Sequence, residues 1–211
     1  MPHIIETISN ATAANALEAL QAAHDFLASQ VVAAQSELAS DTAHWGMAMK
    51  RAVVDLEGGP PLVGKTSERF VELINILATT ERTIEALRWL AGEYPDSQVR
   101  ECHASTSDDS KGNDIVLTDA GGKVIVRCEV CDVISKNPGQ NGKEKSDLKN
   151  LGCQEAVPDD GVHRYIATSP EFAAALTGRL RKWKQLHYSY ESLETGLPQQ
   201  TVMLRVLASS L

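Results

Sequence analysis

The sequence predicts an α/β protein whose mixed β-sheet is flanked by helices. Apolar residues recur at helical spacing before residue 95, and the pattern changes to strand-like alternation from residue 98. Three strands in succession are then followed by a helix, a strand, a helix and a last strand. Successive strands pair antiparallel, whereas a strand–helix–strand crossover places two parallel strands in one sheet, so we expect a mixed sheet.

The first part of the chain is expected to be helical. Apolar residues from Leu17 to Leu38 recur at alternating spacings of three and four, which predicts one long helix. A second helix is predicted through Trp45, Met49 and Val53, ending at the Gly-Gly-Pro-Pro run 58–61. We expect the two helices to form a hairpin packed on the rest of the protein. A dimerising coiled coil is the alternative.

A further long helix is predicted to begin at Thr66 or Ser67 and to end near Gly92. Its apolar residues lie on one face of the helix. A break is expected at Thr79 and Thr80, where β-branched and polar residues cluster.

The chain length of 211 residues fits one domain, or one domain with an appendage. We expect residues 1–61 to form the helical appendage and residues 62–211 the α/β core. The core elements after the long helix are predicted as strands at 98–104, 115–118 and 123–134, a helix at 143–151, a strand at 163–168, a helix from 169 to about 186, a polar stretch at 188–200 and a strand at 201–207.

The two strands around Gly121 and Gly122 are the most informative about function. With these glycines as a two-residue turn, Asp114 faces Glu129. Directly opposed side chains share a sheet face with Cβ atoms about 4.5–5.5 Å apart. Two carboxylates that close repel each other, so either both point to solvent or a divalent metal lies between them. A four-residue turn would keep both on one face, whereas a three-residue turn would put them on opposite faces.

These residues and the element order resemble the PD-(D/E)XK nuclease superfamily, metal-dependent nucleases that include many restriction endonucleases. The resemblance covers about residues 67–186 and rests on Asn113-Asp114 before one strand and Glu129-Val-Cys131 in the next. It implies a restriction endonuclease-like fold in which Asp114 and Glu129 hold Mg²⁺ (or Mn²⁺) and phosphodiester bonds are hydrolysed, in DNA rather than RNA. Asn113 stands where the family often has Pro, and Cys131 stands where it has the catalytic Lys.

The missing lysine is the main departure from this pattern. Phosphodiester hydrolysis needs a hard cation held by a few carboxylates, to which the backbone carbonyl of residue 130 could add a ligand. The family's lysine orients the attacking water and offsets charge on the phosphorus, which a thiol does poorly. Three explanations are open: Lys145 or Lys149 on the following helix replaces it, Arg127 contributes, or the site is inactive and the fold is kept for binding.

Neighbouring elements offer further candidates for the site. The helix before the sheet could supply an additional acid from Glu72 or Glu68. His103 lies on the strand before Asp114, and Asp108 and Asp109 are rival first carboxylates in a loop. Taken alone, Glu72, Glu68 and His103 are more often ordinary surface residues, and the hairpin register favours Asp114 over the two loop acids.

The end of the helix predicted up to residue 186 interleaves basic and aromatic residues. Arg and Lys suit phosphate groups, and aromatic rings can stack on bases or pack beneath the helix. The alternative is a solvated helix face. The candidate nucleic-acid contacts are Arg179, Arg181, Lys182 and Lys184.

Composition limits the other possibilities. A net charge of −8 argues against a protein that coats nucleic acid non-specifically. No apolar run approaches the roughly 18–20 residues of a membrane helix, and the first residues lack a signal-peptide pattern, so we expect a cytoplasmic protein without a membrane partner. Cys128 and Cys131 form a CxxC within a strand, where alternation sends the two thiols to opposite faces and disfavours a zinc site.

Three classes of function therefore remain. The leading hypothesis is a metal-dependent endonuclease, with a homodimer through the N-terminal helices. The alternative is a catalytically inactive module of the same fold that binds nucleic acid or a protein partner. A cysteine enzyme built on Cys131 with His103 is the third class, although nothing in the sequence lowers the pKa of that thiol.

Overall fold

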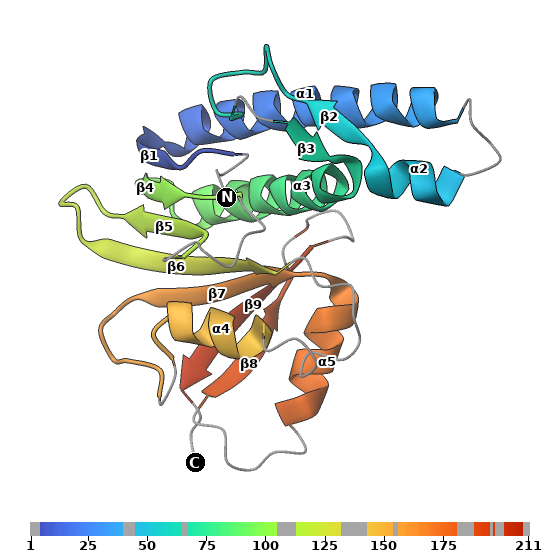
Figure 1. The fold of residues 1–211 in the computed structure, drawn as a ribbon. Coiled ribbons are helices and arrows are strands. Elements are labelled where there is room, and N and C mark those ends of the chain that lie inside the picture. The colour runs from blue at the N-terminus through green and yellow to red at the C-terminus, as the bar shows by residue number, and fades with distance from the viewer. Residues whose placement is uncertain are drawn as a thin grey trace.

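The protein is an α/β structure built on a seven-stranded mixed sheet that is flanked by helices. Two long helices, α1 (Ala13–Leu38) and α3 (Phe70–Glu93), pack against each other (Figure 1). The computed structural model describes residues 5–39, 45–64, 67–104, 113–131, 143–153, 156–180, 188–194, 196 and 201–208. The side chains of 45, 143–145, 178–180 and 188 lie outside the description as well.

The sheet has the strand order β1-β4-β5-β6-β7-β9-β8. Among these strands, β6 and β7 are parallel neighbours and every other neighbouring pair is antiparallel, so the predicted mixed sheet is confirmed. A separate ribbon pairs β2 with β3. The strands are β1 (Ile8–Thr12), β2 (Val53–Asp55), β3 (Ser67–Arg69), β4 (Gln98–Cys102), β5 (Ile115–Thr118), β6 (Val124–Cys131), β7 (His163–Thr168), β8 (Tyr188–Leu193) and β9 (Val202–Ala208).

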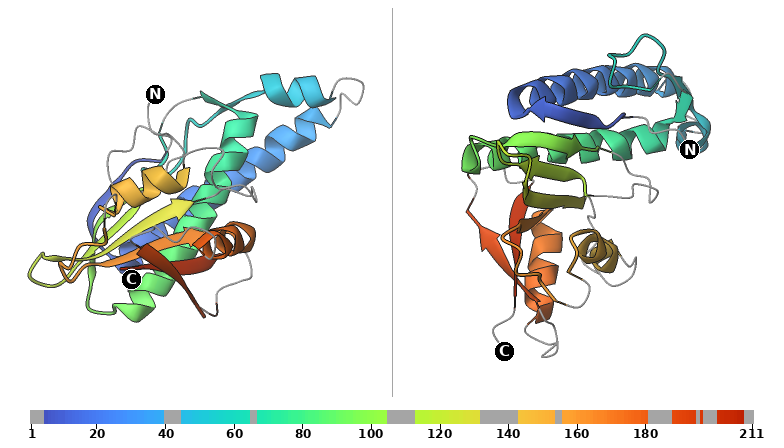
Figure 2. Two further views of the ribbon diagram at one scale, coloured as in Figure 1. Left: turned by 90° about the horizontal axis from the view of Figure 1, so that it is seen from below. Right: turned by 90° about the vertical axis from the view of Figure 1, so that its left-hand side faces the viewer.

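Helices cover both faces of the sheet. The shorter ones are α2 (Trp45–Arg51), α4 (Lys143–Asn150) and α5 (Pro170–Leu180). On β7, Tyr165 and Ala167 pack into the hydrophobic cluster formed with α1 and α3, while Ile166 packs with Leu148 of α4 and Phe172 of α5. Successive strand residues point to opposite faces. The pair α1 and α3 therefore covers one face and the pair α4 and α5 the other (Figure 2). No helix in the described ranges is long and apolar enough to cross a membrane.

The N-terminal region contributes a strand as well as helices. Strand β1 pairs with β4, and Thr12 caps α1 by accepting the Asn15 N–H at 3.2 Å. The second predicted helix ends at Arg51, and Val53 belongs to β2, so the prediction was wrong there. Strand β1 adds an edge to the sheet, and described residues of the region up to residue 61, among them Leu20, Leu27 and Leu56, share the hydrophobic core of the rest. The boundary at residue 61 stays a prediction.

The long helix α3 differs from its prediction in two ways. It begins at Phe70, because Ser67–Arg69 pair with β2 as a strand. It also runs without the expected break. The hydroxyls of Thr79, Thr80 and Thr83 donate to the carbonyls one turn earlier, at 2.7–3.0 Å, so these polar side chains are satisfied inside the helix.

The β5–β6 hairpin has the expected register but a different turn. The Asp119 N–H donates to the Lys123 carbonyl at 2.9 Å, and Gly122 is left-handed with φ at 80°, so three residues form the loop. Such a loop alone would shift every pair by one residue. A β-bulge in β6 inserts an extra residue and restores the register, so that Leu117 faces Val126.

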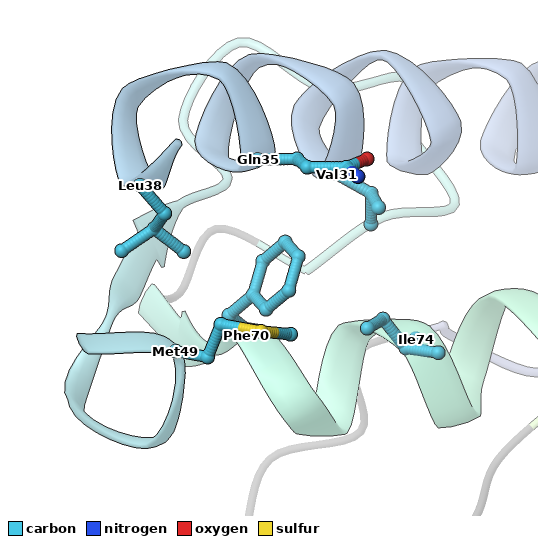
Figure 3. A pocket seen from close by; sticks show the side chains of 6 residues that line it. All are labelled: Val31, Gln35, Leu38, Met49, Phe70 and Ile74. Carbon is cyan, nitrogen blue, oxygen red and sulfur yellow. The ribbon is translucent and has the colours of Figure 1, made fainter. Parts of the chain in front are cut away.

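An apolar pocket of about 160 Å³ lies between α1, α2 and the start of α3 (Figure 3). Its lining residues are Val31, Gln35, Leu38, Met49, Phe70 and Ile74. Gln35 is the polar member of this lining, and none of the predicted site residues belongs to it. The pocket lies in the helical layer opposite α4 and α5, so it does not contribute to acid–base or metal chemistry.

Candidate functional site

Glu129 is the centre of a buried polar network near the end of β6, with 1 % of its surface exposed. Helix α4 packs against this strand, and Asn150 Nδ2 donates to Glu129 Oε2 at 3.2 Å. From the segment before β5, Asn113 Nδ2 donates to Glu129 Oε1 at 2.8 Å. Arg127 Nη1 donates to Asn113 Oδ1 at 3.0 Å. The network therefore joins the sheet to α4 through one carboxyl group.

Asp114 lies beside this network at the start of β5. Continued by one residue, the register of β5 with β6 places Asp114 opposite Glu129, as the sequence predicts. Its Oδ2 accepts the Val130 N–H at 2.6 Å, and its carbonyl accepts the His103 N–H at 2.7 Å. Because strand N–H groups point along the sheet, this carboxylate is turned toward the plane of the sheet. Asp114 thus ties β4 to β6 where β5 begins.

Burial and neighbouring acids make Glu129 a weak acid. Burial raises the pKa most, and the Asp114 carboxylate raises it further. The hydrogen bond from Asn113 lowers it, Asp147 of α4 raises it, and the hydrogen bond from Asn150 lowers it, with a resulting pKa of about 9. The raised pKa favours the protonated form of Glu129 at pH 7 when no cation is bound. A positive charge brought beside it would favour the ionised form.

The carboxylates of Asp114 and Glu129 suit Mg²⁺ or Mn²⁺ better than Zn²⁺. Within the described ranges, no three His, Cys, Asp or Glu side chains lie together as a metal site. Within the described residues, Asp114 and Glu129 offer carboxylates to a cation at the end of β6, and the buried Asp147 of α4 lies near Glu129. The backbone carbonyl of Val130 is the further oxygen that the sequence predicts. Mg²⁺ keeps several waters and needs only one or two carboxylates, whereas Zn²⁺ takes three or four protein ligands. The donor set suits Mg²⁺ or Mn²⁺.

The two strand cysteines are buried in different clusters. Cys131 packs on the face of α4 and α5, and Cys128 packs on the face of α1 and α3, as alternation predicts. Burial, with Asp114 and Glu129 nearby, raises the pKa of Cys128 well above its ordinary value. The side chain of Cys131 is fully buried, which separates it from a substrate. The geometry gives no support to a cysteine nucleophile.

The cationic side chains lie differently from the prediction. Lys149 is exposed on α4, and the side chain of Lys145 lies outside the described residues. Arg127 is engaged in the network through its hydrogen bond to an asparagine. Arg82, which sequence reasoning missed, reaches from α3 and donates through Nη1 to the Cys131 carbonyl at 3.1 Å. A positive charge from another element therefore stands at the end of β6.

Of the other predicted site residues, two acids lie on α3 and β3, His103 reaches Asp114 through its backbone N–H, and the rest have side chains outside the described residues. Glu72 is exposed on the first turn of α3, about 15 Å along the helix axis before Arg82, and Glu68 lies in β3. His103 is half-buried, and its Nδ1 lies 2.8 Å from Thr7 Oγ1. The side chains that lie outside the described residues are those of Asp108, Asp109, Arg179, Arg181, Lys182 and Lys184.

Two residues of α4 near Glu129 were also missed. Asp147 and Asn150 are three positions apart, so they share a face of the helix. That spacing was visible in the sequence. Nothing in the sequence indicates which face of the helix meets β6.

Comparison with profiles of known protein families, with curated proteins and with solved structures found no match. Function is therefore inferred from the fold and the geometry around Glu129. The pattern of elements and the chemistry of the acidic groups carry that inference.

Proposed function

We propose that this protein is a metal-dependent endonuclease of restriction endonuclease-like fold that hydrolyses phosphodiester bonds, in DNA before RNA, with Mg²⁺ or Mn²⁺. The observation that carries the proposal is the meeting of Asp114 and Glu129 at the end of β6, where the Asp114 carboxylate raises the electrostatic cost of ionising Glu129. Buried acids held this close are suited to a divalent cation.

The element order supports the same proposal. From α3 onward the chain forms three antiparallel strands, β4 to β6, then α4, and then β7 parallel to β6. This is the order on which the resemblance to PD-(D/E)XK nucleases rests. Asp114 precedes the second of these strands and Glu129 lies on the third, as that resemblance implies.

The residues at the end of β6 fit a hard cation. Asp114, Glu129 and the Val130 carbonyl offer oxygen ligands, and Glu129 would lose its proton when the cation binds. A bound Mg²⁺ supplies Lewis-acid activation of a phosphate and of a water. The protein's own part is to hold Glu129 in one orientation and to exclude bulk water from it, which its burial accomplishes.

The positive charge that the resemblance assigns to position 131 must come from elsewhere. Cys131 is buried under α4 and α5 and carries no charge. Arg82 is the cation whose contact with the end of β6 supports this role, since its guanidinium bonds the Cys131 carbonyl. Lys149 and Lys145 on α4 stay candidates, and Arg127 acts through Asn113. A cation there would offset charge that builds on the phosphorus.

The second candidate function is a non-catalytic module of the same fold that binds nucleic acid or a protein partner. The observation that favours it is the network itself. A protonated Glu129 held by two asparagine amides is a neutral, hydrogen-bonded group that needs no cation for stability. The full burial of Cys131 also favours the binding module, because this thiol cannot replace the catalytic lysine.

A cleavage assay separates the two. Purified protein is incubated with plasmid, linear DNA and RNA in Mg²⁺ or Mn²⁺, beside the variants Asp114→Ala and Glu129→Ala. We expect metal-dependent cleavage that both variants abolish while their far-UV circular dichroism is unchanged. Folded wild-type protein without cleavage in either metal would refute the endonuclease and leave the binding module.

The partner proposals concern other parts of the chain. We propose that Arg179, Arg181, Lys182 and Lys184 contact nucleic-acid phosphates, which makes binding weaken as salt rises. A homodimer through the N-terminal helices and a cytoplasmic location complete the proposal. Fluorescence anisotropy with labelled DNA at two salt concentrations tests the first of these.

A further inference from the structure

Two asparagines from different elements hold the carboxyl group of Glu129. Asn113 Nδ2 donates to Oε1 at 2.8 Å, and Asn150 Nδ2 donates to Oε2 at 3.2 Å. Each oxygen has two lone pairs, so each keeps one after accepting an amide hydrogen. The plane of the carboxyl group is therefore fixed between the sheet and α4, and once Glu129 is ionised each oxygen keeps one lone pair that these amides do not use.

Arg127 determines which way the Asn113 amide faces. Its Nη1 donates to Asn113 Oδ1 at 3.0 Å, and a guanidinium has only donors. The amide oxygen must therefore face Arg127, which leaves Nδ2 to face Glu129. A donor directed at a carboxyl oxygen stabilises its ionised form, which is the form that binds a cation.

We propose that Asn113 and Asn150 are positioning residues that hold Glu129 for a divalent cation, with Arg127 orienting Asn113, so that α4 is part of the site. The inference rests on the cation of the proposed function and not on cleavage. Partners that orient a metal-binding carboxylate typically contribute 10–100-fold to metal affinity. Asparagines with a purely structural role would affect folding and leave cation affinity unchanged.

Mn²⁺ binding to the full-length chain tests this, measured by electron paramagnetic resonance of the free ion. We expect Asn150→Ala to weaken Mn²⁺ binding by about 10–100-fold with an unchanged far-UV spectrum. The control is Ser146→Ala, which alters another exposed side chain of α4 and should bind Mn²⁺ as the wild type does. Asn150→Gln keeps the amide one methylene further out and should give an intermediate affinity.

Asn150→Asp provides a readout that a structural role would not produce. It keeps the shape of the side chain but sets a second acid against Glu129, so the melting temperature should fall in a chelator and recover in Mn²⁺. Equal Mn²⁺ affinity in the wild type and Asn150→Ala would overturn the inference, as would a wild type that binds no Mn²⁺. If Mn²⁺ binds with the expected losses but no nucleic acid is cleaved, the inference stands and the endonuclease fails.

Discussion

Glu129→Gln tests whether this side chain carries a proton in the cation-free protein. Gln has nearly the shape of a protonated Glu, and its Oε1 can accept from Asn113 as the Glu oxygen does. Its Nε2 cannot accept from Asn150 Nδ2, so the Asn150 amide must turn its oxygen toward the Gln or lose this bond. That cost does not depend on pH, whereas the loss of ionisation does. Any difference between the two proteins that changes with pH then comes from the titration of Glu129.

The sign and size of the effect follow from the raised pKa. The pKa of Glu129 is about 9 in the folded protein and 4.5 as an ordinary side chain, so the folded state binds the proton more tightly. Its contribution to stability is fully present below pH 4.5 and is lost as pH rises toward 9. One such group changes the free energy of unfolding by about 1.4 kcal/mol per pH unit within that window. Between pH 6 and 8 the wild type should lose about 3 kcal/mol relative to Glu129→Gln.

Urea unfolding followed by circular dichroism, in a chelating buffer at pH 6, 7 and 8, measures this difference. Glu72→Gln, at an exposed position on the first turn of α3, is the matched control and should follow the wild-type pH dependence. Adding Mn²⁺ at pH 8 should stabilise the wild type and not Glu129→Gln. If the wild type and Glu129→Gln keep a constant difference from pH 6 to 8, Glu129 is not a protonated buried acid and the electrostatic argument for the site is wrong.

Two further outcomes are expected. Asp160→Asn should lower the free energy of unfolding by about 1–2 kcal/mol at pH 7, because Arg164, only 3 % exposed, loses its charged partner at 2.7 Å. Pairing lowers the pKa of Asp160 to about 2, so this difference should shrink as pH falls from about 4 toward 2; a constant difference in urea unfolding would contradict it. Arg82→Met should slow metal-dependent cleavage by about 10²–10³-fold without changing Mn²⁺ affinity, whereas an unchanged rate would exclude Arg82 as the missing cation.

The sequence predicts the central strands well because their side chains face apolar layers on both sides. The predicted bounds of β5 and β7 match the structure, since both are short runs containing β-branched or aromatic residues between turn signals. The outer strands β1 and β8 were missed, because edge strands carry polar residues that resemble loops. In β8, Tyr190 is buried beside exposed Glu191, an alternation that the polar composition concealed.

The site was predictable where it depended on local pairing and unpredictable where it depended on packing. Opposed strand residues brought Asp114 and Glu129 together, although the turn was longer than predicted and a bulge compensated for it. Asn150 and Arg82 reach β6 from helices on opposite faces of the sheet. Which side chains a helix presents to a strand depends on how the helix is rotated about its axis and how far it is shifted along that axis. The spacing of apolar residues determines both only to within about one helical turn.

The burial of Cys131 changes how an active site and an inactive one are to be distinguished. Cys131 shares a strand face with Glu129, and both lie under α4, so a lysine at position 131 would have to enter an apolar cluster. A charge would cost several kcal/mol there, and restoring the lysine is therefore a poor test of activity.

The positive charge at the end of β6 belongs instead to Arg82, which reaches this strand from α3 on the opposite face of the sheet. If the protein is a nuclease, a bound cation must displace the proton from Glu129. In a binding module, the protonated acid and its two asparagines form a network that needs no cation. The response of Glu129 to Mn²⁺ therefore decides between the two functions more directly than the residue at position 131 does.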